Sequence, residues 1–172
     1  MSVSDRIEKR ILLRAPVPRV WRALTDVEEF GAWFGVRLDE PFAPGRTVTG
    51  RFVVLPDEEM FEEYQRAQGL QPAKVAIPTG SIVFCTVETM EPQRYFSFRW
   101  IPYSIDAECD PAQEPTTLVE FRLEAVAEGT RLTIVESGFE RVPAHRRERA
   151  FRMNDGGWGA QIENVKRYVE RG

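Results

Sequence analysis

The sequence predicts an α+β domain in which a curved antiparallel sheet of about six to seven strands wraps around a long C-terminal helix, leaving an apolar cavity between them. Three observations predict this fold class. A strand-like segment near the N-terminus is followed at once by two short helical patterns. A run of strand-like segments with short connections comes next, and one long helical pattern closes the chain. The element order is therefore β-α-α-β-β-β-β-β-β-α, which excludes a doubly wound parallel sheet.

Residues 5–14 form the first predicted strand, because Ile7, Ile11 and Leu13 share one face and charged residues occupy the other. Pro16 then opens a helix at a position where its missing N–H costs nothing. Apolar residues at helical spacing give this helix one buried face, made of Val17, Val20, Trp21 and Leu24.

A second short helix is predicted to begin at Asp26. The Asp26 carboxylate can accept a hydrogen bond from the backbone N–H of Glu29 while the Glu29 side chain reaches back, a reciprocal capping arrangement. Gly35 ends the helix, because glycine readily adopts the left-handed conformation found after a helix C-terminus. The buried face is aromatic and consists of Phe30, Trp33 and Phe34.

The middle of the chain alternates between apolar and polar residues, the pattern of half-buried strands. The predicted strands lie at residues 46–54, 80–90, 94–101, 116–126 and 131–138. In the third of these, Phe96, Phe98 and Trp100 share one face. Turn residues at 91–93 and 128–129 join neighbouring strands as short hairpins, so the pairing is antiparallel.

A long helix is predicted over residues 143–171, with apolar or polar-neutral positions recurring every three or four residues. Its stripe contains Ala150, Phe151, Asn154, Trp158, Ile162, Val165 and Val169. Gly156, Gly157 and Gly159 interrupt it, at a cost of about 1 kcal/mol each relative to alanine. Because the stripe stays in register through them, we expect close approach of the helix to the sheet and not a kink.

We treat residues 1–172 as one domain with an insertion at about 56–78, in which residues 57–68 form a short helix with Phe61 and Tyr64 inward. The acidic segment 102–115 is interpreted as a solvated loop. A basic run at the start of the long helix, made of Arg146, Arg147, Arg149 and Arg152, points several ways and is predicted to be solvated.

Composition excludes several functional classes. Among 172 residues there are 23 Lys and Arg against 27 Asp and Glu, a formal charge of −4, which argues against nucleic-acid binding. One histidine and two widely spaced cysteines predict neither a metal centre nor a disulfide framework, and no cofactor motif is present. No segment has the roughly 20 apolar residues of a membrane span, so we predict no stable membrane insertion, and the charged N-terminus favours a cytoplasmic location.

The element order and several short motifs resemble the START-like, or SRPBCC, superfamily, whose fold is called the helix grip. More closely, they resemble the branch of homologues of the activator of the heat-shock chaperone ATPase. The resemblance covers about residues 5–170 and rests on Ala15-Pro16, Val20-Trp21, Ala23-Leu24-Thr25-Asp26, Phe30, Trp33-Phe34-Gly35, Glu91-Pro92, Phe98-Arg99-Trp100, Glu136-Ser137-Gly138-Phe139 and Gly156-Gly157-Trp158. It implies a cavity between the long helix and the concave sheet face that takes lipids, sterols or polyketides. Ile101 stands where close relatives often have a histidine.

The predicted ligand-binding residues face this cavity. They are Trp33, Phe34, Phe52, Phe98, Trp100, Phe121, Glu136, Asn154, Trp158 and Ile162. The alternative for the aromatic residues is ordinary core packing. Glu136 falls on the inward phase with Leu132 and Ile134, where burial would raise its pKa and suit it to proton transfer or to binding a polar group. Alternatively it reaches water or an arginine at the strand end.

Three functions are compatible with these residues. The first is binding of a small hydrophobic or amphipathic molecule, gated by the first helices and the insertion. The second is a cyclase-, aromatase- or hydrolase-type enzyme with Glu136 as general base and Tyr95 or Tyr103 as acid. The third, implied by the resemblance, is a co-chaperone-like role with a protein partner.

Overall fold

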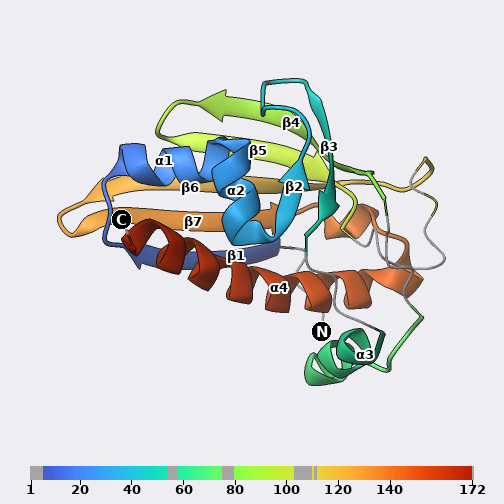
Figure 1. Cartoon of the computed structure of the whole chain (residues 1–172). Helices are drawn as coiled ribbons and strands as arrows, with labels where there is room; N and C mark the ends of the chain where they lie inside the picture. Colours follow the sequence, from blue (N-terminus) through green and yellow to red (C-terminus); the bar gives the residue numbers. More distant parts are fainter. Residues whose placement is uncertain (1–5, 54–57, 75–79, 103–109, 111, 172) are drawn as a thin grey trace.

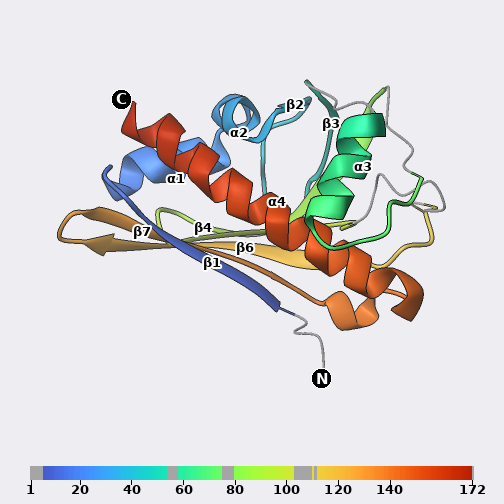
Figure 2. The same cartoon turned by 90° about the horizontal axis from the view of Figure 1, so that it is seen from below.

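A seven-stranded antiparallel sheet curves around one long helix in the computed structural model, which describes residues 6–53, 58–74, 80–102, 110 and 112–171 (Figures 1 and 2). This confirms the predicted α+β helix-grip fold. The elements in chain order are β1 (Arg6–Leu13), α1 (Val17–Thr25), α2 (Val27–Phe34), β2 (Val36–Leu38), β3 (Thr47–Phe52), α3 (Glu58–Ala67), β4 (Ile82–Glu91), β5 (Tyr95–Trp100), β6 (Thr117–Val126), β7 (Gly129–Ser137), the 3₁₀ turn η1 (Phe139–Arg141) and α4 (Ala144–Glu170).

The strand order is β1-β7-β6-β5-β4-β3-β2, so the N-terminal strand closes one edge and β2 forms the other. The hairpins β4–β5 and β6–β7 lie where the turn residues predicted them. The sequence did not predict β2 as a separate strand, because three residues are too few to show an alternating pattern. On the same face of the sheet as α4 lie α1 and α2 (Figure 1).

The start of α2 follows the predicted cap only in part. The Asp26 carboxylate accepts hydrogen bonds from the backbone N–H groups of Glu28 and Glu29, at 3.0 and 3.1 Å. The Glu29 side chain, however, does not reach back. It accepts hydrogen bonds from Arg19 at 2.6 Å and from the Tyr168 hydroxyl at 3.0 Å. The second half of the predicted capping box is therefore wrong, because a cation and a hydroxyl from other helices outcompete the local amide.

Two glycines shape the end of α2 and its contact with the sheet edge. Gly35 ends α2 with a φ of 93°, as predicted. At Gly31, a Cβ atom would lie 2.2 Å from the carbonyl oxygen of Val36, so only glycine lets α2 approach β2 this closely. This contact brings the aromatic face of α2 onto the concave side of the sheet.

The centre of the concave side is filled with the protein's own aromatic rings. Phe30 of α2 packs against the buried rings of Phe98 and Phe121, at centroid distances of 6.4 and 6.5 Å. Phe96 and Phe121 stack at 5.7 Å. Phe30, Phe96, Phe98 and Phe121 are all fully buried, at 0% exposure. The deep part of the helix grip is therefore core.

The helix α4 continues unbroken through its glycines, as predicted, but the close approach is not to the sheet. A Cβ atom at Gly156 would lie 2.6 Å from the Gln68 side chain and 2.7 Å from the Tyr64 hydroxyl, so the neighbour is α3 with the turn that follows it (Figure 2). The Tyr64 hydroxyl donates to the Met153 carbonyl at 2.7 Å. Tyr64 and Phe61 are half-buried, and the fully buried residue of α3 is Gln65, not one of the two aromatic residues.

The basic run at the start of α4 is not simply solvated, which corrects our prediction. Arg147 donates to the carbonyl groups of Phe139, Glu140 and Val142 and so caps η1. The other three arginines also bind neighbouring segments. Arg149 donates to the Gln65 side chain and to the Gln71 carbonyl, and Arg152 donates to the carbonyls of Gln68 and Gly69. Arg146 donates to the Glu114 carboxylate at 2.6 Å. The spacing of these arginines along the helix shows that their side chains point in different directions, but it does not show which other segment each side chain contacts.

The packing of α3 on α4 predicts opposite effects for two alanine substitutions in one helix. A methyl group at Gly159 meets no described atom within 4 Å, so Gly159→Ala is expected to stabilise the fold by about 0.5–1 kcal/mol through helix propensity alone. Gly156→Ala displaces the Gln68 and Tyr64 side chains, and we expect no gain or a loss of about 1 kcal/mol. Urea unfolding of both variants measures the difference. Equal stabilisation by both would contradict the contact with α3.

Candidate functional site

Glu136 lies near the C-terminal end of β7 with its side chain toward α4, and it is fully buried, at 0% exposure. Its Oε2 atom accepts hydrogen bonds from Trp100 Nε1 at 2.8 Å and from Thr117 Oγ1 at 2.6 Å. Its Oε1 atom accepts from Trp158 Nε1 at 2.9 Å. The Asn154 amide donates to both oxygens, at 3.0 and 3.1 Å. One carboxylate thus joins β5, β6, β7 and α4.

The electrostatics of this carboxylate are unusual because every donor is neutral. Among the described residues no Lys or Arg forms an ion pair with Glu136, so its charge has no counter-ion there. Burial raises the pKa of Glu136 above its ordinary value, while the hydrogen bonds from the four donor residues act in the opposite direction. Indole N–H groups can only donate, and one points to each oxygen, so the donor set matches the anion. The sequence prediction that Glu136 is buried with a raised pKa agrees with this geometry.

An aromatic group surrounds the carboxylate. Trp100 and Trp158 stack with ring centroids 5.5 Å apart, and Phe34 lies 6.1 Å from each of them. Phe84 lies 5.8 Å from Trp100. Phe34, Trp100 and Asn154 are half-buried, whereas Trp158 and Phe84 are buried. The half-buried side chains therefore form the boundary between the filled core and the outside. We call these three the boundary residues.

The ten predicted ligand-binding residues separate into two groups. Six are buried in the core, namely Trp33, Phe98, Phe121, Glu136, Trp158 and Ile162. The boundary residues and Phe52 of β3 are half-buried. Phe52 makes no ring contact with any other aromatic side chain in the described part of the chain, so it lies apart from the group around Glu136. Direct ligand contact without displacement of core atoms is open only to the half-buried group.

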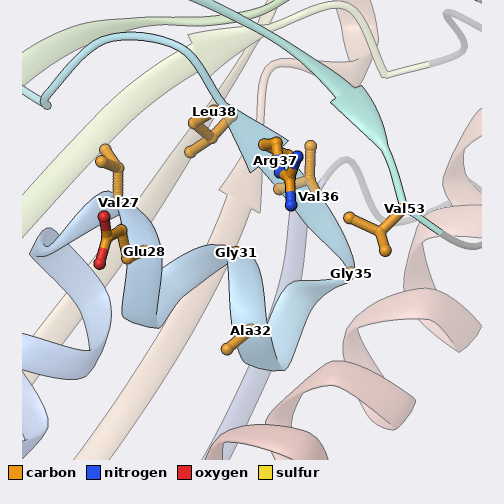
Figure 3. A pocket seen from close by; sticks show the side chains of 9 residues that line it. All are labelled: Val27, Glu28, Gly31, Ala32, Gly35, Val36, Arg37, Leu38 and Val53. Atoms are coloured by element: carbon orange, nitrogen blue, oxygen red, sulfur yellow. The ribbon is translucent and has the colours of Figure 1, made fainter.

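The sequence did not predict a pocket of about 630 Å³ between α2 and β2 (Figure 3). Its walls combine apolar side chains with Glu28 on α2 and Arg37 on β2, and none of the ten predicted residues lines it. At Gly35 an added side chain would meet no described atom within 4 Å, whereas at Gly31 the Val36 carbonyl group already fills that space. The glycines in an otherwise aromatic helix were the available signal, but their spacing alone does not distinguish close packing from an open pocket.

Of the two predicted acid partners, Tyr95 does not join Glu136. Tyr95 lies on the opposite face of β5, where its hydroxyl donates to Glu120 at 2.6 Å, so the prediction that it acts with Glu136 is wrong. Tyr103 and the acidic residues Asp106 and Glu108 lie outside the described residues. Cys85 is buried, which raises the pKa of its thiol to about 12, and it has no nucleophilic character at neutral pH.

Across the described residues, His, Cys, Asp and Glu side chains do not assemble in groups of three or more that could hold a metal ion. None of the helices in that part of the chain is long and apolar enough to span a bilayer.

The chain matches one family model, and its fold is similar to that of several solved structures. A family model described as "Activator of Hsp90 ATPase homolog 1-like protein" matches residues 14–170. The fold is similar to that of protein MLL2253 from Mesorhizobium loti, with a TM-score of 0.66, 22% identity and coverage of 96% of this chain and 97% of that one. No curated protein sequence matches significantly.

Two further solved structures share the fold. Protein DynU16 has a TM-score of 0.63 and 22% identity, and the match covers 98% of this chain but only 48% of DynU16, so this chain corresponds to about half of that protein. CalU16 from Micromonospora echinospora has a TM-score of 0.54 and 17% identity, with coverage of 95% of this chain and 74% of that one. At these identities the likeness concerns the fold alone.

Proposed function

This chain belongs to the family of Activator of Hsp90 ATPase homolog 1-like proteins, and we propose that it binds a small hydrophobic or amphipathic molecule between α4 and the sheet. The ligand lies against the boundary residues Phe34, Trp100 and Asn154, outside the filled aromatic core. The family model matches residues 14–170, a range that includes every element that carries this site.

One observation carries the proposal. Two large aromatic side chains, Phe34 and Trp100, stay half-buried at a centroid distance of 6.1 Å, next to a polar group that also stays half-buried, the Asn154 amide. Covering such aromatic surface stabilises a complex by about 25 cal/mol per Å² of apolar area, while the amide and the carboxylate behind it orient a polar substituent.

Native mass spectrometry of the purified chain tests the proposal. We expect an additional non-covalent mass, or uptake of a mass from a panel of lipids, sterols and aromatic polyketides. A ligand present at one hundred times its Kd adds about 2.7 kcal/mol of stability, which corresponds to a rise in Tm of roughly 5–10 °C.

A pair of tryptophan variants locates the site. Both Trp100 and Trp21 are half-buried, but Trp21 lies on α1 and, among the described residues, makes no ring contact with Phe34 or Trp100. Trp100→Phe is expected to weaken binding about fivefold or more, because it removes aromatic area and an N–H donor, whereas Trp21→Phe leaves the Kd unchanged. A bound mass that neither variant affects argues for a different site. Absence of any bound mass and of any rise in Tm across the panel contradicts the proposal.

A further inference from the structure

We infer that this site selects neutral or cationic ligands that carry an N–H or O–H donor and rejects organic anions, and that Glu136 sets this selectivity. The inference rests on the proposed function, because it concerns which molecules occupy the same site. Among the ligands that an apolar site accepts, it predicts that alcohols, phenols and amines bind more tightly than fatty acids and aromatic carboxylates.

In the part of the chain that the structure describes, the charge of Glu136 is solvated by dipoles and not neutralised by a cation. Its four donors are two indoles, a hydroxyl and an amide, and each is uncharged. Lys9 of β1 also faces α4, but its ammonium group lies 2.9 Å from the Asp155 carboxylate, so its charge is compensated locally. In an interior of low effective dielectric, an uncompensated carboxylate produces a negative potential over its surroundings.

The boundary residues bring a ligand within range of that potential. Trp100 and Asn154 are half-buried and each donates directly to Glu136, so a ligand that touches either one is separated from the carboxylate by a single side chain. A unit charge at roughly 6–8 Å and an effective dielectric of about 20 changes affinity by about tenfold to a hundredfold. The affinity for an anion is lowered by this factor, whereas the affinity for a cation is raised by part of it.

The Asn154 amide is also the donor that a ligand can most readily replace. It spans both carboxylate oxygens at 3.0 and 3.1 Å, the longest of the hydrogen bonds to Glu136, and its residue is not fully buried. A ligand hydroxyl or amine that takes its place keeps the carboxylate fully hydrogen-bonded. A ligand with acceptors only leaves the amide in place and gains no polar contact from Glu136.

Three probes of one shape test the selectivity by calorimetric titration into the full chain: 2-naphthol, 2-naphthylmethylamine and 2-naphthoate at pH 7.5. We expect the naphthoate to bind at least about tenfold more weakly than the other two. In Glu136→Gln this ratio is expected to fall to about twofold. Comparing ratios between the two proteins cancels the different hydration of the probes themselves. The ¹H–¹⁵N signals of the four tryptophan indoles report whether each probe reaches Trp100 and Trp158.

A second variant keeps the test informative if Glu136→Gln does not fold. Asn154→Lys places an ammonium group next to the carboxylate on a half-buried position of α4, and we expect it to abolish the discrimination against naphthoate. Ala160→Lys is the control, since it adds the same charge at an exposed position of the same helix. It should leave the ratio as in the wild type.

The outcomes separate the two claims. Equal or tighter binding of naphthoate by the wild type, or a ratio unchanged by both Glu136→Gln and Asn154→Lys, overturns the inference while small-molecule binding stands. Failure of all three probes to bind, together with an empty native mass spectrum, contradicts the proposed function and the inference with it.

Discussion

Glu136→Ala is expected to lower the free energy of unfolding by about 3–5 kcal/mol, because it leaves the buried donors of Trp158 and Thr117 and the partly buried donor of Trp100 without an acceptor. The side chain is fully buried, so the truncation also opens a small polar cavity. Urea unfolding followed by tryptophan fluorescence measures the loss, and the loss of indole hydrogen bonds should be visible in the ¹H–¹⁵N spectrum.

The matched control is Glu124→Ala on β6. Glu124 is exposed and pairs with Arg131 at 3.2 Å on the strand surface, so its removal should cost no more than about 0.5–1 kcal/mol. A loss below about 1 kcal/mol for Glu136→Ala would mean that water replaces the carboxylate among its donors, and the boundary would then be more open than the burial of Glu136 indicates.

The pH dependence of stability follows from the same residue. The pKa of Glu136 is raised in the folded state, so its contribution to stability is fully present below the unfolded pKa, near 4.5, and is lost as pH rises through the folded pKa. Glutamine does not titrate. The wild type should therefore lose stability relative to Glu136→Gln as the pH increases from about 4, and urea midpoints of the two proteins across this range give the sign directly.

Phe98→Ala is the second substitution with a large expected effect, a loss of about 3–5 kcal/mol. Phe98 has 0% exposure and lies 5.5–6.4 Å, between ring centroids, from five other aromatic residues. Removing its ring leaves a cavity that the surrounding rings can close only in part. Benzene should bind in that cavity and restore part of the lost stability.

Phe34→Ala provides the comparison, because the same ring is removed at the half-buried boundary. We expect a smaller loss of stability than at Phe98 but a weaker affinity for the ligand proposed above. If Phe98→Ala costs less than about 1.5 kcal/mol, Phe98 already borders open space, and the ligand site extends into what we describe as core.

The sequence was most informative where a local pattern has a single structural meaning. Alternation placed Phe96, Phe98 and Trp100 on the inward face of β5, and all three lie there. Helical spacing put Asn154 and Trp158 on one side of α4, and both contact Glu136. These patterns report the direction of a side chain from its own backbone, which is why they transfer to the structure.

The predictions that failed all concern partners from distant segments. The basic run on α4 binds α3, η1 and the loop before β6, and Gly156 makes room for α3 and the turn after it, not for the sheet. Tyr95 alternates outward and bonds Glu120. A side chain's direction does not reveal what the folded chain places opposite it.

The sequence by itself determined the order of the elements other than β2, the inward faces of the strands and of the last helix, and the presence of an acidic group on one of those faces. Only the tertiary structure decided that four uncharged donors from three elements, β5, β6 and α4, meet at Glu136, and that most of the predicted cavity lining is occupied by aromatic core. The reason is physical: periodicity is a property of neighbouring residues, whereas packing and hydrogen-bond convergence depend on distances between residues far apart in the chain.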